Sequence, residues 1–175
     1  MNIIIKPVST NIEEYIDMGI NTFLFPLKDY AVEFINYFTL NEIKSIKEKY
    51  SDINIFVSIN KNILNEEIND IEDILKELDS IGIKGVFFYD AAILSIKNKL
   101  NLTFDLVWNG TFMVTNYKTC DYYYGKGCKY ALLSQEITKD EIIEIINNTK
   151  ITPIVELISS PVIAFSKRHL VSHYY

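Results

Sequence analysis

The residues best suited to bind a ligand lie in the last third of the chain, beside the ends of predicted strands. Asn109 follows a strand that ends at Val107, and Glu136 follows another strand. Ligands bind along the carboxyl edge of a parallel α/β sheet. There, amides and carboxylates contact polar substrate groups, and basic side chains contact an anion or a phosphate. We therefore predict a substrate-binding surface made of Asn109, Thr115, Asn116, Glu136, Lys167 and Arg168.

Short apolar runs alternate with helical stretches and predict the elements that would hold these side chains. The expected strands are 3–5, 22–25, 53–59, 85–89, 103–107, 129–133 and 152–158. The expected helices are 11–18, 39–49, 65–81, 91–97, 114–124 and 138–148. The strands are almost continuously apolar, which favours a parallel sheet covered on both faces. A repeat of roughly 25 residues fits a (β/α) barrel or an open doubly wound sheet.

We expect one domain over residues 1–175 with an α/β fold, a (β/α) TIM-type barrel that is incomplete, with about seven strands. No glycine-rich phosphate loop follows the first strand, which disfavours a dinucleotide-binding sheet. Either the sequence is an N-terminal fragment, or the last strand is supplied elsewhere or absent. Because an open sheet edge tends to be covered or paired, a homodimer or a partner protein is compatible with this expectation.

Local sequence signals predict several helix ends. Thr39 with Glu42, and Thr138 with Glu141, are spaced as capping boxes. Asp90 is placed to cap the helix that opens at residue 91. Three glycines are expected to end helices in the left-handed conformation: Gly19, Gly82 and Gly125.

Composition limits the classes of function. The formal net charge is −6, so nucleic acid binding would need a local basic patch, a missing segment or a partner. Apolar residues make up 49% of the chain, yet no apolar run approaches the roughly 20 residues of a membrane span. The opening residues lack the features of a signal peptide. We therefore expect a cytoplasmic protein with reduced cysteines and no membrane association.

Metal binding and nucleophilic catalysis have weak support in the residues. Cys120 and Cys128 would lie about 12 Å apart along a helix, too far to clamp one metal without other ligands. His169 and His173 have the i, i+4 spacing of a two-histidine site, but the carboxylate of a zinc protease helix is absent. No Gly-x-Ser-x-Gly nucleophile elbow is present. Ordinary structural roles are the expectation for these four residues.

Other polar and aromatic residues allow two interpretations. The pair Lys126 and Lys129 is either solvated or directed into the barrel mouth to hold an anion. A carboxylate such as Glu136 or Glu156 in an apolar strand is either a polar group of the mouth or paired with Arg168 or a lysine. Trp108 is either packed in the core or rim, or a stacking platform for a base.

Four blocks of sequence resemble peptidase family U32, the collagenase-like proteases. They are Trp-Asn-Gly-Thr-Phe-Met-Val-Thr-Asn-Tyr from Trp108, Tyr-Gly-Lys-Gly from Tyr124, Ala-Leu-Leu-Ser-Gln-Glu-Ile-Thr from Ala131, and Phe-Ser-Lys-Arg-x-Leu-x-x-x-Tyr from Phe165. The resemblance covers essentially the whole chain and aligns it with the N-terminal domain of the family. It is nearest to the YrrN-type subgroup, which makes 5-hydroxyuridine at the tRNA wobble position.

The resemblance implies a partner and places the cofactor there. Many family members hold an iron–sulfur cluster through four cysteines, the first of which follows the Ser-x-Arg motif. Here His169 occupies that position. The YrrN-type subgroup also lacks this cysteine. We therefore expect no metal or cofactor in this chain. A cluster would be carried only by a cysteine-bearing homologue (YrrO-type), and tRNA would be bound through the complex.

The resemblance leaves three functions open. The first is a subunit or accessory of tRNA wobble-uridine hydroxylation. The second is a protease, as the family name implies, although no nucleophile or metal set is identifiable. The third is a non-catalytic scaffold for a cluster-bearing homologue, because Ile158 and Ser159 replace a His-Gly pair that family members commonly carry.

Overall fold

A computed structural model of the chain describes residues 2–158. The predicted site residues Lys167 and Arg168 lie outside the described residues, as do His169, His173 and Ser159. Within residues 2–158, no helix has the length and apolar character needed to cross a membrane.

Within residues 2–158, six parallel strands form one sheet in chain order. They are β1 (Thr22–Pro26), β2 (Asn54–Ile59), β3 (Gly85–Phe88), β4 (Asp105–Trp108), β5 (Tyr130–Leu132) and β6 (Thr152–Ile154). Each strand pairs with the next, so the sheet curls into a half-barrel whose carboxyl ends share one edge. The incomplete α/β barrel predicted from the sequence is therefore confirmed.

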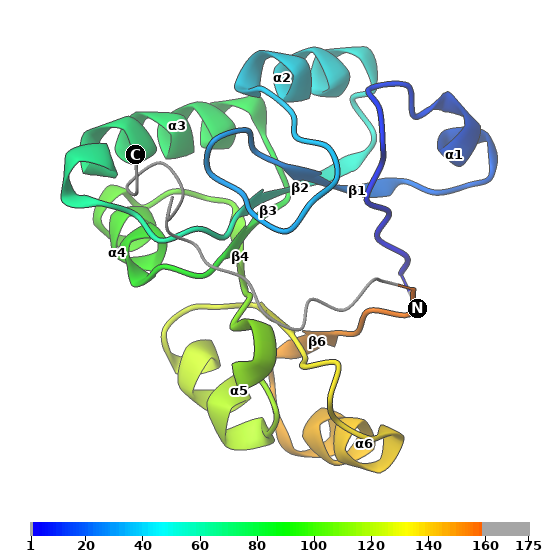
Figure 1. The fold of residues 1–175 in the computed structure, drawn as a ribbon, viewed down its shortest axis with the longest axis vertical. Helices are drawn as coiled ribbons and strands as arrows, with labels where there is room; N and C mark the ends of the chain where they lie inside the picture. Colours follow the sequence, from blue (N-terminus) through cyan, green and yellow to red (C-terminus); the bar gives the residue numbers. More distant parts are fainter. Residues whose placement is uncertain (1, 159–175) are drawn as a thin grey trace, which may run out of the picture.

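In the described part of the chain, six α-helices connect and cover the strands. They are α1 (Glu13–Asp17), α2 (Leu40–Lys49), α3 (Ile68–Ile81), α4 (Ala91–Leu100), α5 (Tyr117–Gly125) and α6 (Lys139–Asn148). Figure 1 shows α2 to α6 arranged around the outside of the curled sheet. Two 3-10 turns, η1 (Asn65–Glu67) and η2 (Thr111–Met113), precede α3 and α5.

Helix capping follows the sequence signals closely. The hydroxyl groups of Thr39 and Thr138 accept hydrogen bonds from the backbone of Glu42 and Glu141, and both capping boxes form. Asp90 caps α4 by accepting from the Ala92 N–H at 2.9 Å. These caps satisfy free amides of the first turn and fix where α2, α4 and α6 begin.

The two faces of the sheet bury different sets of side chains. The outer face and the helices share the large core, in which Phe23, Ile55 and Leu106 are fully buried. The opposite, inner face carries a smaller set that we call the inner cluster: Leu24, Phe56, Phe87 and Val107. Both faces are apolar because the half-barrel covers one side with helices and folds the other upon itself.

The structure corrects several predicted boundaries. The segment 3–5 contributes one bridge, Ile5 with Phe23, rather than a full strand, because its pairing stops after a single residue. The last strand ends at Ile154, so Glu156 lies beyond it. The helix expected at 114–124 begins at Tyr117, because η2 occupies residues 111–113 and Asn116 caps the helix.

One predicted left-handed glycine is also wrong. Gly19 and Gly82 have φ of 84° and 75°, as expected, but the left-handed residue after α5 is Gly127, with φ of 97°. Gly125 is still the last residue of α5, and Lys126 follows in a helical conformation. The backbone therefore adopts the left-handed conformation two residues later than the sequence pattern indicates.

Candidate functional site at the carboxyl edge

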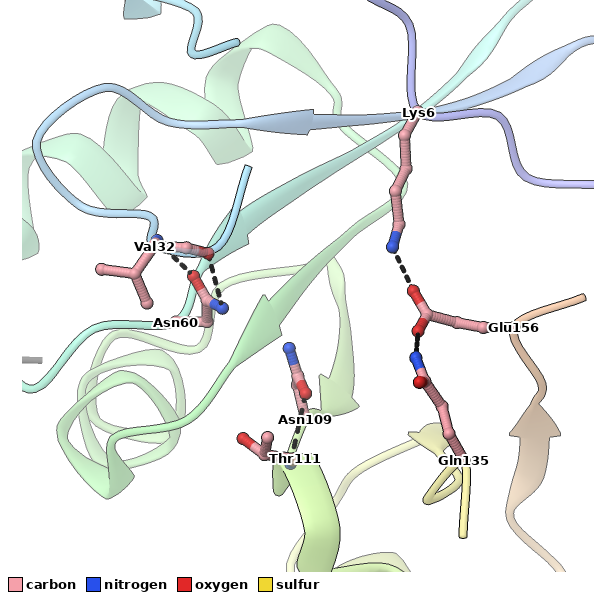
Figure 2. A network of polar contacts seen from close by, with 7 residues as sticks. All are labelled: Lys6, Val32, Asn60, Asn109, Thr111, Gln135 and Glu156. Atoms are coloured by element: carbon pink, nitrogen blue, oxygen red, sulfur yellow. Dashed lines mark hydrogen bonds and ion pairs between the residues drawn. The ribbon is translucent and has the colours of Figure 1, made fainter. Parts of the chain in front are cut away.

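Asn109 extends the β4 ladder into the opening at the carboxyl edge of the half-barrel, which we call the mouth. Its backbone N–H donates to the Phe88 carbonyl at 2.9 Å, so it continues the parallel pairing one residue beyond the strand. Its side-chain oxygen accepts from the Thr111 N–H at 3.4 Å. The side chain is half-buried. This arrangement holds the Asn109 carboxamide at the strand end, where Figure 2 draws it among the other polar residues of the edge.

A three-residue network links both ends of the sheet. The Lys6 ammonium donates to one oxygen of Glu156, and the Gln135 amide donates to the other. Figure 2 shows Glu156 between the two partners. Lys6 lies beside β1, Gln135 follows β5, and Glu156 follows β6. The ion pair of Lys6 and Glu156 therefore joins the first strand to the last across the opening of the half-barrel.

Lys6 and Gln135 were missed from the sequence alone. The bridge between Ile5 and Phe23 sets Lys6 level with Leu24, whose side chain belongs to the inner cluster. Alternation along that segment puts Ile4 and Lys6 on the inner face. In the sequence, Lys6 stands two residues after Ile4, an apolar residue of the inner face. The pairing register is needed to show that Lys6 meets Glu156, after the end of β6.

The segment between β1 and α2, residues 27–39, crosses the mouth. It exceeds the about 2–6 residues usual for such connections, and segments of this length are often functional. Figure 1 shows it in front of β2 and β3. Its ends are pinned together, because the Lys28 N–H donates to the Phe38 carbonyl at 2.8 Å and the Phe38 N–H donates to Pro26 at 2.9 Å. Residues 27–39 therefore form a closed loop over the inner face.

Asn60 holds that loop from beneath. Its side chain is 2% exposed and makes a reciprocal pair with Val32, accepting from the N–H at 2.9 Å and donating to the carbonyl at 3.2 Å. Two residues on, Phe34 packs against the inner cluster, with the Lys6 ammonium 5.7 Å from its ring centre. Glu33 between them has φ of 75°, a strained conformation for a residue with a side chain.

The described residues of the predicted surface all lie at this edge, but most have structural partners. Asn116 is the N-cap of α5 and accepts from the Thr119 N–H at 3.0 Å. Thr115 is exposed and accepts from the Asn116 amide at 3.4 Å. Glu136 is exposed in the turn after β5, and its N–H donates to the Ser134 hydroxyl at 3.2 Å. The Ser134 N–H donates to the Val114 carbonyl at 3.0 Å, which brings this turn beside the segment after β4.

Lys126 and Lys129 do not point into the mouth. Lys129 precedes β5 and pairs at 3.0 Å with Asp105, the first residue of β4, so both lie at the amino edge of the sheet. Lys126 follows the last turn of α5, and its ammonium lies 5.5 Å from the ring centre of Tyr122. Each helix returns the chain to the amino edge of the sheet before the next strand begins. Lys126 and Lys129 therefore lie at the edge opposite the one that carries Asn109.

Trp108 is a packed residue of the core. It is 6% exposed, and Tyr123 stacks on it with a centroid distance of 3.9 Å. Phe88 lies 5.3 Å from it at a tilt, and Tyr89 lies nearly parallel to it at 6.1 Å. A ring enclosed in this way has no free face for a base. Glu156 is paired with a lysine, since it bonds to Lys6, and the pair lies across the opening of the half-barrel.

The two cysteines are buried, protonated thiols. Burial raises the pKa of Cys120 to about 11, with Asp121 adding to the shift. Burial raises the pKa of Cys128 to about 12. The sequence holds two cysteines, and both pack in the large core, so they do not fit a cluster that needs four cysteine ligands. Among residues 2–158, no group of three or more His, Cys, Asp or Glu side chains is arranged to hold a metal ion.

Solved structures of similar shape define the class as a (β/α) barrel. A crystal structure of 2,3-dimethylmalate lyase, a PEP mutase/isocitrate lyase superfamily member, matches with a TM-score of 0.65 at 8% identity, covering 95% of this chain and 70% of that one. The U32 peptidase Mk0906 matches with a TM-score of 0.66 at 10% identity, covering 87% of this chain and 66% of that one. At these identities the likeness shows the fold alone.

The sequence profile of peptidase family U32 matches residues 10–175, so the chain belongs to that family. A curated relative is tRNA hydroxylation protein P2 of Bacillus subtilis, which is 24% identical over 176 residues. The match covers 99% of this chain and 57% of the relative. The chain therefore spans little more than half the length of that protein.

Replacing Asn60 should loosen the loop over the mouth. Asn60→Ala leaves the Val32 N–H and carbonyl without their side-chain partner, which costs about 1–3 kcal/mol for a buried polar group. We expect faster hydrogen exchange at the Val32 amide and a lower free energy of unfolding in urea. The exposed neighbour gives the control, Asn62→Ala, which should change neither. Unaltered exchange at Val32 in Asn60→Ala would show that Asn60 does not hold the loop.

The cysteine environment predicts slow thiol chemistry in the folded protein. At pH 8, iodoacetamide should modify Cys120 and Cys128 only as fast as the protein unfolds, and mass spectrometry should find rapid double alkylation in urea. Because both folded pKa values exceed the unfolded value, the free energy of unfolding should fall as pH rises above about 9. Cys128→Ala should show a smaller fall. Rapid single alkylation of the native chain would contradict the assigned burial.

Proposed function

We propose that this chain is a subunit or accessory of tRNA wobble-uridine hydroxylation, the reaction that forms 5-hydroxyuridine. The observation that carries the proposal is the match along 99% of the chain to a protein named for tRNA hydroxylation. The tRNA substrate also fits the predicted cytoplasmic location. As part of this proposal, we extend to this chain the activity, substrate and partner of the complete relative.

The polar groups of the carboxyl edge support the proposal. Asn109 holds a carboxamide at the end of β4, and an amide both donates and accepts hydrogen bonds, as the edge of a uracil base requires. The ion pair of Lys6 and Glu156 adds a cation that is 46% exposed and a carboxylate that is 15% exposed. In this proposal Asn109, Asn116 and Glu136 make polar contacts with the substrate, and Lys167 and Arg168 contact phosphate.

The redox chemistry belongs to a partner in this proposal. His169 stands where related chains carry the first cluster cysteine, and the two cysteines present are buried neutral thiols. We assign the iron–sulfur cluster to a cysteine-bearing U32 homologue. This chain would orient the tRNA loop at the mouth and position the target base, with no reaction step of its own.

Deletion of the gene in its native host tests the proposal. We expect loss of 5-hydroxyuridine-type nucleosides from hydrolysed tRNA by mass spectrometry, and restoration by the wild-type gene. Asn109→Ala and Arg168→Ala should fail to restore them, because each removes a substrate contact. An exposed asparagine on α3 provides the control, Asn69→Ala, which should restore them fully.

Different outcomes separate the other two functions. An unchanged nucleoside profile in a host without a redundant homologue would contradict the proposal. Cleavage of gelatin or casein by the purified chain would then favour the protease. Loss of the nucleosides on deletion, with full restoration by every mouth variant and co-purification of a cysteine-bearing homologue, would indicate a scaffold.

A further inference from the structure

One surface outside the mouth combines exposed aromatic rings with lysines. Lys118 and Tyr122 lie on α5, and Lys126 is the residue that caps its C-terminus in a helical conformation. The three stand at i, i+4 and i+8, which is one row along a helix surface. All three are exposed, and Tyr122 is 60% exposed although it is a large apolar ring. The Lys126 ammonium lies 5.5 Å from the ring centre of Tyr122. We call these three residues the α5 row.

The Tyr122 ring is braced by the core. Tyr123 meets it edge to face, with a centroid distance of 5.2 Å and an interplanar angle of 87°. Tyr123 in turn stacks at 3.9 Å on Trp108, which is buried at the end of β4. A ring held by its neighbour loses little conformational freedom when a second planar group stacks on it. The exposed ring is therefore pre-organised for stacking.

The local charge is opposite to that of the whole chain. Residues 115–127 contain two lysines against one carboxylate, a net charge of +1, while the chain carries −6. That carboxylate, Asp121, accepts a hydrogen bond from the Thr149 hydroxyl at 3.0 Å. A second lysine, Lys118, lies 5.2 Å from the ring centre of Tyr117. This segment is a basic, aromatic patch on an acidic molecule.

We propose that the α5 row binds unpaired nucleotides of RNA, with a base stacked on Tyr122 and flanking phosphates held by Lys118 and Lys126. Exposed aromatic rings interleaved with cations are the means by which proteins bind single-stranded nucleic acid without reading its sequence. The row deepens the function proposed above, on which it rests, by supplying a second contact for the substrate tRNA. The mouth receives the target uridine, and α5 holds nucleotides outside it.

The test is direct binding of the full chain to a fluorescent, unmodified anticodon stem-loop, measured by anisotropy. Tyr122→Ala should weaken binding about 5- to 150-fold, the range for loss of one stacked base. Tyr122→Phe keeps the ring and should bind like the wild type. Lys118→Ala or Lys126→Ala should reduce the slope of log K against log salt by about 0.7. Lys44→Ala, at an exposed lysine of α2, is the matched control and should leave the slope unchanged.

Each outcome decides between the surface and the broader function. No binding by the wild type, or equal binding by Tyr122→Ala, would overturn the α5 row. An acidic peptide that binds as well as the RNA and ignores Tyr122→Ala would identify a protein-binding patch instead. If binding depends on Tyr122 while gene deletion leaves tRNA nucleosides unchanged, the surface stands and the wobble-uridine function fails. If deletion removes the nucleosides but chromosomal Tyr122→Ala retains them and binds RNA normally, only the α5 row fails.

Discussion

All six strands run in the same direction and pair in chain order, and this constraint decides where every candidate side chain lies. In a parallel sheet each strand must be followed by a return across the outside, so the segments after the strands gather at one edge. Asn60, Asn109 and Glu156 come together at that edge although they are far apart in sequence. The same rule sends Lys129 and Asp105 to the opposite edge.

The open half-barrel has an apolar inner face that must be covered and a gap between its first and last strands that must be bridged. The Lys6–Glu156 pair connects those two strands, and Phe34 covers part of the inner cluster. Lys6 is about half exposed, so the pair contributes modestly to stability, since exposed ion pairs are screened by water. Its larger effect is positional, because it fixes a cation and a carboxylate in the mouth. The loop that carries Phe34 depends in turn on Asn60, a residue of β2's end.

Local signals predicted the fold better than they predicted the site. Thr39, Thr138 and Asp90 cap helices where the sequence indicates, because capping depends on residues within one turn. The alternation of apolar runs with helical stretches predicted an incomplete barrel of about seven strands, and residues 2–158 form six of them. The first segment was predicted too long, because only Ile5 pairs with β1, and pairing depends on the distant residue Phe23.

The site required information that periodicity does not contain. Asn109 was identified because it directly follows a buried strand. Lys6, Asn60 and Gln135 were missed because their partners are set by register and by the path of the loop 27–39. Lys126 and Lys129 were assigned two alternatives, and the structure places them at the amino edge because α5 carries the chain back there.

The central claim is that the carboxyl edge receives the wobble uridine. The most direct measurement is photo-crosslinking of tRNA that carries 4-thiouridine at the wobble position, in an extract of the deletion strain supplemented with the purified chain. The account predicts adducts on peptides from the segments after β4 and β5, residues 109–116 and 133–138. Adducts confined to amino-edge segments, such as residues 126–129, or no adducts in an extract that hydroxylates the unlabelled tRNA, would contradict it.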